Sequence, residues 1–162
     1  MARTALVTGS AGFIGYFTSK ALLAQGWNVV GLDAMTDYYD VELKNRRHEM
    51  LMQSAGFSVV NARLETPNLL RDLFEKHQFD AVIHLAAQAG VRYSIEAPRS
   101  YVESNLVGTF ELLEAARAFP PAHMLLASTS SVYGANTQMP YTENDKVDTQ
   151  MSFYAATKKA TE

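Results

Sequence analysis

Short apolar segments alternate with longer amphipathic segments along this chain. The apolar runs predict β-strands at residues 3–8, 28–33, 57–61, 81–85 and 124–128. Apolar residues at helical spacing predict helices at residues 13–25, 40–55, 66–77 and 99–118, and a last helix that starts near residue 152. The large side chains of the first helix indicate a buried stripe of Phe13, Phe17, Ala21, Leu22 and Leu23, and one face of the fourth carries Val102, Leu106, Phe110, Leu113 and Ala116.

This alternation is typical of an α/β protein in which a parallel sheet carries helices on both faces. Right-handed crossovers then give the strand order 3-2-1-4-5 of a doubly wound, Rossmann-type sheet. Ligands of such sheets bind beyond the carboxyl ends of the strands where the order reverses, and Gly9, Asp33, Ala86 and Ser128 all fall at that edge. Because no linker-like run interrupts the pattern, we predict one domain over residues 1–162, which ends after the fifth strand and the start of the next helix.

Three glycines, Gly9, Gly12 and Gly15, follow the first strand in the pattern G-x-x-G-x-x-G. A turn between a strand and a helix exposes the first N–H groups of the helix, which can hold a phosphate. Gly9 would allow the tight turn, Gly12 the close approach of a pyrophosphate, and Gly15 close packing of the helix on the strand. The alternative is a tight turn that binds no ligand.

An acid, Asp33, ends the second predicted strand, 24 residues after Gly9. A carboxylate there can accept hydrogen bonds from both ribose hydroxyls of an adenosine and would repel a 2′-phosphate. Ala34 and Met35 follow it, so no arginine is adjacent to hold such a phosphate, and the pattern favours NAD over NADP. The alternative is that Asp33 serves only a loop or a helix N-terminus.

Tyr154 and Lys158 lie four residues apart on the last predicted helix and therefore share one face. An unperturbed tyrosine has a pKa of about 10, so half-ionisation at pH 7 needs about 4 kcal/mol. A neighbouring ammonium and a nicotinamide cation favour the phenolate. Hydroxyl residues after the fifth strand, among them Thr129 and Ser130, could bind a sugar oxygen, and Arg92 could reach an anionic substrate. Without the glycine turn, each of these would be interpreted as an ordinary helix pair, polar loop or solvated side chain.

Composition excludes several classes of protein. Hydrophobic residues make up 48% of the chain, so disorder is not expected, and the net charge of −3 offers no general attraction to nucleic acid or an anionic membrane. Cysteine is absent, which excludes disulfides and thiolate metal sites, and no apolar run is long enough for a membrane span. We expect a cytoplasmic protein without a metal. The basic run at residues 44–48 is interpreted as a solvated helix face, and His84 as a hydrogen-bonded core residue.

Several motifs occur in the order and at the spacing of a known family. They are residues 8–15, residues 84–87, residues 105–109, residues 131–134 and residues 154–158. With them, the chain resembles the extended short-chain dehydrogenases/reductases of the NAD-dependent sugar-nucleotide epimerase/dehydratase family, over essentially all 162 residues. Residues 37–44 and 88–94 are similar to those of UDP-glucuronate 4-epimerases.

The resemblance implies an activity and a set of site residues. It implies Thr129, Tyr154 and Lys158 as the catalytic set, and NAD held by Gly9, Gly12, Phe13, Ile14, Gly15, Asp33, Leu85, Ala86, Ala87, Asn105, Tyr154 and Lys158. The implied reaction is epimerisation of a UDP-sugar through transient oxidation at C4. Dehydratases and decarboxylases of the family usually carry an acid after the hydroxyl residue, where this chain has Ser130 and Ser131. UDP-glucose/galactose 4-epimerase and a non-catalytic NAD-binding fragment are the alternatives.

The chain departs from the family pattern in two ways. Arg63 stands where an acid usually contacts the adenine. Family members also continue for roughly as long again, with a substrate domain that these residues lack, so we expect weak or no turnover from residues 1–162 alone. The resemblance further implies a homodimer formed through the helix at 99–118 and the Tyr154 helix.

Overall fold

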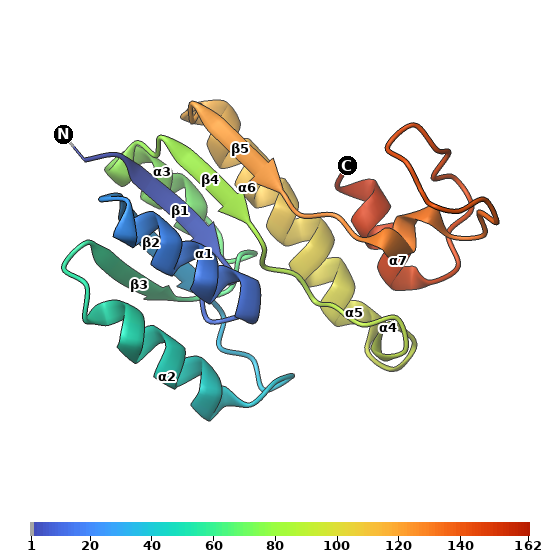
Figure 1. Cartoon of the computed structure of the whole chain (residues 1–162), viewed down its shortest axis with the longest axis horizontal. Helices are drawn as coiled ribbons and strands as arrows, with labels where there is room; N and C mark the ends of the chain where they lie inside the picture. The colour runs from blue at the N-terminus through green and yellow to red at the C-terminus, as the bar shows by residue number, and fades with distance from the viewer. Residues whose placement is uncertain (1) are drawn as a thin grey trace.

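A computed structural model describes residues 2–162 of the chain. Its five strands form one parallel sheet in the order β3-β2-β1-β4-β5, as predicted (Figure 1). The strands are β1 (Thr4–Thr8), β2 (Asn28–Asp33), β3 (Phe57–Asn61), β4 (Ala81–His84) and β5 (His123–Leu126). The predicted fold class, a doubly wound α/β sheet, is confirmed.

Helices cover the two faces of the sheet unequally. α1 (Phe13–Ala24) and α2 (Val41–Met52) pack together on one face, and α3 (Leu69–His77) and α6 (Gly108–Ala118) pack together on the other. On the α1/α2 side, Val7, Ile83 and Leu125 lie side by side across β1, β4 and β5. Within residues 2–162 no helix covers Leu125, which is 47% exposed.

The two core layers follow from the alternation of side chains along buried strands. Leu6, Val30, Leu32 and Val82 pack against Phe74 and Leu112 on the α3/α6 side. Val7 and Val29 pack against Tyr16, Leu51 and Phe57 on the α1/α2 side. Each central strand is thus apolar on both faces, which explains why its sequence is a continuous apolar run.

The region predicted as one helix at 99–118 is three consecutive pieces: α5 (Pro98–Tyr101), a π-helical segment η1 (Val102–Val107) and α6. A further short helix, α4 (Tyr93–Glu96), precedes them. The inserted residue of a π-helical turn shifts the phase, so the side chains of Val102, Phe110 and Leu113 are exposed while Tyr101, Asn105, Leu112 and Ala115 are buried. The long predicted loop before the last helix contains a short 3₁₀ helix, η2 (Ser130–Tyr133), and α7 spans Phe153–Ala160.

The predicted stripe of α1 is right for Leu22 and Leu23, which are half-buried and pack against the core, but wrong for Phe13, Phe17 and Ala21. Phe13 is 66% and Phe17 52% exposed, and the helix instead buries Gly15, Tyr16 and Ser19. The reason lies at Gly15, where a Cβ would stand 2.0 Å from the carbonyl oxygen of Gly9. The helix approaches β1 through its smallest residue, so the large side chains turn outward.

His84 joins three elements of the core, as predicted. Thr8 Oγ1 accepts hydrogen bonds from the amides of Leu85 and Ala86, both at 3.1 Å. Its own hydrogen therefore goes to Nδ1 of His84, 2.8 Å away, and Nε2 of His84 donates to Thr109 Oγ1 at 3.1 Å. Burial, with a smaller effect of Lys158, lowers the pKa of His84 to about 4. The imidazole is thus a neutral connector between β1, β4 and α6.

Candidate functional site

The ends of three central strands meet at one edge of the sheet, where sequence patterns placed the site. The Gly9 amide donates to the carbonyl of Leu32 on β2 at 2.7 Å. A Cβ on Gly9, whose φ is +72°, would stand 2.9 Å from the amide nitrogen of Ala86, just after β4. The structure therefore brings the glycine turn, the end of β2 and the segment Leu85–Ala87 into contact.

Only the first helical turn of α1 has N–H groups left for an anion. The amides of Gly9 and Ser10 donate to Leu32, that of Ala11 donates to Asp33 Oδ2 at 3.1 Å, and that of Gly12 donates to the Gly9 carbonyl at 3.0 Å. Among the described residues, no hydrogen-bond acceptor meets the amides of Phe13 and Ile14. Both amides belong to the first turn of α1, at the positive end of the helix.

Asp33 is almost fully buried at the end of β2. Besides the Ala11 amide, its carboxylate accepts from the amide of Met35 at 2.9 Å. The ammonium of Lys44 lies 3.9 Å from Asp33 Oδ1 and donates to the carbonyl of Thr36 at 2.8 Å. The acid is therefore rigidly held beside the glycine turn, where a ribose of a dinucleotide would lie.

The interpretation of residues 44–48 as a solvated face holds for Asn45 and Arg46, which are exposed, but is wrong for Lys44 and His48. Lys44 is 6% and His48 4% exposed, and together with Leu51 they form the inner side of α2. Their spacing of four and three residues is helical, but sequence reasoning gave weight only to apolar residues at that spacing. Two polar residues that continue the i, i+4, i+7 stripe of a buried leucine, on a helix that must cover a glycine turn, were the signal that could have identified them.

Asn105 links the segment after β4 to the helix of Tyr154. Its side chain accepts from the Gln88 amide at 2.7 Å, donates to the Gln88 carbonyl at 3.0 Å, and donates to Thr157 Oγ1 at 3.0 Å. Thr157 in turn donates to the carbonyl of Tyr154 at 2.8 Å. The π-helical turn presents this asparagine between the two segments, a use that such turns often have at functional sites.

Lys158 is a buried cation on the same helix as Tyr154. It is 5% exposed, and burial lowers the pKa of its ammonium, while Glu162 acts in the opposite direction. Within residues 2–162, no carboxylate lies within ion-pair distance of it. Ser152 starts α7 by accepting from the amide of Ala155 at 3.0 Å, which orients the helix that carries both side chains.

The other predicted site residues lie nearby or at the surface. Thr129 starts η2, where its hydroxyl accepts from the Ser131 amide at 3.2 Å, and η2 packs against α7. Ser130 is exposed, and Ser128 is bonded to Glu162. Arg92, at the start of α4, is exposed, and within residues 2–162 no hydrogen bond or ion pair joins its side chain to Thr129, Tyr154 or Lys158.

A cluster of tyrosines, which the sequence did not predict, lies between the segment after β2 and α7. The rings of Tyr38 and Tyr93 are 4.8 Å apart, and that of Tyr101 is 6.3 Å from Tyr93 and 6.0 Å from Tyr154. The Tyr101 hydroxyl donates to the carbonyls of Ala89 and Gly90 at 2.7 and 2.6 Å, and burial raises its pKa to about 12. Tyr101 therefore stays protonated and fixes the segment after β4.

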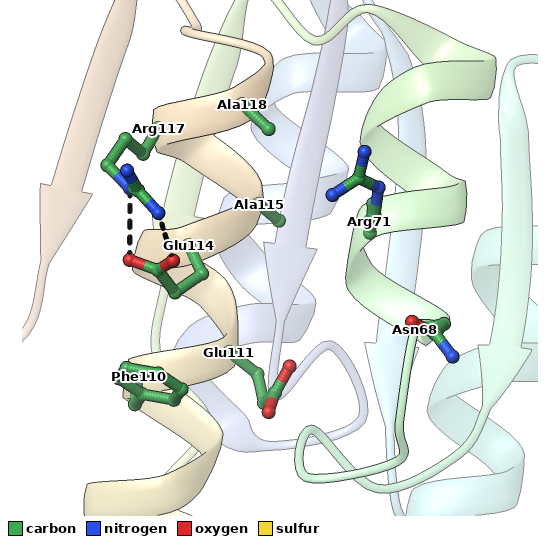
Figure 2. A pocket seen from close by; sticks show the side chains of 8 residues that line it. All are labelled: Asn68, Arg71, Phe110, Glu111, Glu114, Ala115, Arg117 and Ala118. Carbon is green, nitrogen blue, oxygen red and sulfur yellow. Dashed lines mark hydrogen bonds and ion pairs between the residues drawn. The ribbon is translucent and has the colours of Figure 1, made fainter.

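A hollow of about 390 Å³ between α3 and α6 includes none of the predicted site residues. Figure 2 shows Arg71 of α3, with Asn68 just before that helix, on one side of it and Phe110 with the Glu114–Arg117 ion pair of α6 on the other. Arg63, where an acid was expected, forms an ion pair with Glu65 at 3.2 Å. Residues 2–162 contain no cluster of three metal-ligating side chains, and none of their helices has the length and apolar character to cross a membrane.

Residues 6–162 match the family model of GDP-mannose 4,6-dehydratase. The chain is 54% identical to a probable UDP-glucuronate 4-epimerase of Rhizobium meliloti, covering 97% of this chain and 46% of that protein. It is 50% identical to UDP-glucuronate 4-epimerase 4 of Arabidopsis thaliana, covering 98% and 36%. The UDP-glucuronic acid 4-epimerase of Bacillus cereus, crystallised with UDP-glucuronic acid and NAD, superposes with a TM-score of 0.89 at 32% identity, covering 98% and 49%. The chain thus spans about half the length, or less, of these relatives.

Proposed function

We propose, from the premise that this chain belongs to the GDP-mannose 4,6-dehydratase family, that it is the cofactor-binding part of an NAD-dependent UDP-glucuronate 4-epimerase. The observation that carries the proposal is a continuous set of contacts: the glycine turn meets Asp33 and the segment after β4, and Asn105 joins that segment to the Tyr154 helix. The relatives of similar sequence named above are UDP-glucuronate 4-epimerases rather than dehydratases. Ser130 and Ser131, where dehydratases usually have an acid, support the same choice.

The residues present fit a dinucleotide. A Cβ at Gly9 or Gly15 would collide with backbone, so the turn keeps a close approach that only glycine permits. The unpartnered amides of Phe13 and Ile14 suit a diphosphate, and the carboxylate of Asp33 suits the ribose hydroxyls. Leu85, Ala86 and Ala87 leave room for a cofactor along the backbone after β4. When bound, NAD would accept the hydride of the sugar C4 and return it to the opposite face.

Residues of α7 would transfer the proton of the sugar hydroxyl. Tyr154, as phenolate, would take the proton of the 4-hydroxyl and later give it back. The buried ammonium of Lys158 would favour that phenolate and would hold a ribose hydroxyl of the cofactor. Thr129 would orient the sugar hydroxyl, with Ser130 beside it and Arg92 toward an anionic part of the substrate.

A second copy of the chain is the proposed protein partner. Phe110 is 58% exposed on α6, and Leu113 and Val107 extend the same apolar surface. Burial of such a surface in a homodimer would remove it from water. Sedimentation equilibrium of the wild type and of Phe110→Ser tests this, because the variant should be the more monomeric. A cytoplasmic location also belongs to the proposal and is testable by cell fractionation.

The proposed activity is tested by adding UDP-glucuronate to the NAD-loaded chain and measuring NADH by absorbance. We expect only slow reduction of NAD in the wild type, in line with the weak turnover expected of residues 1–162, and none in Tyr154→Phe, with NAD still bound to both proteins. UDP-glucose as the better substrate would favour the UDP-glucose/galactose 4-epimerase alternative. NAD binding without any reduction would favour a non-catalytic NAD-binding fragment.

A further inference from the structure

Helix α2 contacts the glycine turn through two consecutive residues. Nε2 of His48 lies 2.9 Å from Oγ of Ser10, and both side chains are buried. Next to it, the guanidinium of Arg47 donates to the carbonyl oxygen of Ala11 at 3.0 Å. Ser10 and Ala11 are the residues between Gly9 and Gly12, so α2 bonds to the part of the turn that has no regular secondary structure.

The turn is held from a second side by β2. The amide of Ala11 donates to Asp33, and the amides of Gly9 and Ser10 donate to the carbonyl of Leu32. Two successive residues thus have their side chain, carbonyl and amides engaged by β2 and α2. The amides of Phe13 and Ile14, on the next residues of the chain, stay without a protein acceptor.

A buried imidazole and a half-buried guanidinium need an explanation on a helix whose task is to cover a sheet. Desolvation of a polar group disfavours folding unless a hydrogen bond compensates for it, and an apolar side chain would pack at lower cost. Burial lowers the pKa of His48, the Asp33 charge acts against this and the Lys44 charge adds to it. The imidazole is therefore neutral at pH 7 and can bond to Ser10 without burying a further charge.

We propose that His48 and Arg47 are positioning residues that hold the Gly9–Gly12 turn in the shape that receives a dinucleotide diphosphate. The inference rests on the proposed function, because it assigns these residues to the same cofactor site. A turn that is fixed before binding loses less conformational freedom when the ligand arrives, which raises affinity. This also gives a role to the basic residues of α2 that the sequence pattern had assigned to the solvent.

The test compares NAD binding, by calorimetry at pH 7.5, in the wild type and in His48→Leu, Ser10→Ala and the double variant. Loss of one buried hydrogen bond should weaken NAD binding about tenfold in each single variant. The double variant should bind no more weakly than the weaker single variant, because both remove the same bond. His48→Gln, which keeps an N–H group in reach of Ser10, should restore most of the affinity. Arg47→Met should weaken binding, whereas Arg46→Met, on the exposed side of α2 beside Glu42, should not.

Unfolding in urea and hydrogen exchange of the turn amides separate positioning from mere stability. Faster exchange at Gly12 in His48→Leu together with weaker NAD binding supports the proposal. Lower stability with unchanged NAD affinity and unchanged exchange overturns it. If the wild type binds no NAD, the proposed function fails. In that case, hydrogen exchange of the Gly12 amide in the proteins without NAD still tests whether α2 holds the turn.

Discussion

Acidification should destabilise this fold through one residue, His84. Its imidazole is buried between Thr8 and Thr109, and its Nδ1 accepts the Thr8 hydroxyl hydrogen. A second proton on the ring would sit at Nδ1 and face that hydrogen, while Lys158 adds a repulsive charge. The Thr8 hydroxyl cannot accept from a protonated Nδ1 without giving up a hydrogen bond from the amide of Leu85 or Ala86.

The magnitude follows from the two pKa values of this group. The unfolded chain binds the proton near the ordinary 6.5, whereas the folded chain binds it only near 4. Above pH 6.5 both states are neutral and the stability is complete. Between 6.5 and 4 the unfolded state carries more protons, so the free energy of unfolding falls with falling pH. The total loss is about 3 kcal/mol, a large part of the 5–15 kcal/mol, roughly, of a typical domain.

Urea unfolding followed by circular dichroism, at intervals from pH 7.5 to pH 4, measures this loss. His84→Asn removes the titrating group but keeps an amide oxygen in reach of the Thr8 hydroxyl. Carboxylates titrate in both proteins, so the difference in unfolding free energy between wild type and variant isolates His84. That difference should shrink by about 3 kcal/mol toward pH 4. His123→Asn, at the exposed start of β5, serves as the control substitution of an exposed histidine. A constant difference across this range would refute the reasoning.

Three further outcomes follow from the geometry. Gly15→Ala should lower the free energy of unfolding by about 2 kcal/mol or more, because its Cβ would stand 2.0 Å from the Gly9 carbonyl oxygen. As a control, Lys20→Ala on the exposed side of α1 should change the free energy of unfolding by under about 0.5 kcal/mol. Asn105→Ala should cost about 2–3 kcal/mol in thermal unfolding, since the buried amide and carbonyl of its partner segment lose their bonds; a cost near zero would contradict the linking role. Asp33→Ser should reduce the preference for NAD over NADP in a binding titration, because the carboxylate that repels a 2′-phosphate is gone. An unchanged ratio of the NAD and NADP affinities would mean that other residues set the specificity.

Much of the architecture was predictable because its signals are local. An apolar run followed by glycines identifies β1 and its turn, and the acid that ends β2 marks the same edge of the sheet. Right-handed crossovers then leave little freedom in strand order. His84 was predictable as a core residue because its neighbours on β4 are apolar, and the structure confirms it.

The errors arose where a small or polar residue decides the packing. Gly15 turned α1 so that Phe13 and Phe17 face outward, which counting large side chains cannot detect. Lys44 and His48 are buried because the glycine turn and Asp33 offer them partners, and those partners are distant in sequence. Amphipathic patterns report burial of apolar groups and miss polar side chains that are buried for their bonds.

The π-helical segment η1 limits how this part of the chain can change in length. Deleting one residue between Val102 and Val107 would restore ordinary α-helical hydrogen bonding. It would also rotate all that precedes the deletion by about 100° relative to α6. Tyr101 and Asn105 would then lose their hydrogen-bond partners, although neither side chain had been changed. Single-residue deletions here should be tolerated only when an insertion nearby restores the orientation. The number of residues in η1 therefore sets the rotation of the preceding side chains relative to those of α6.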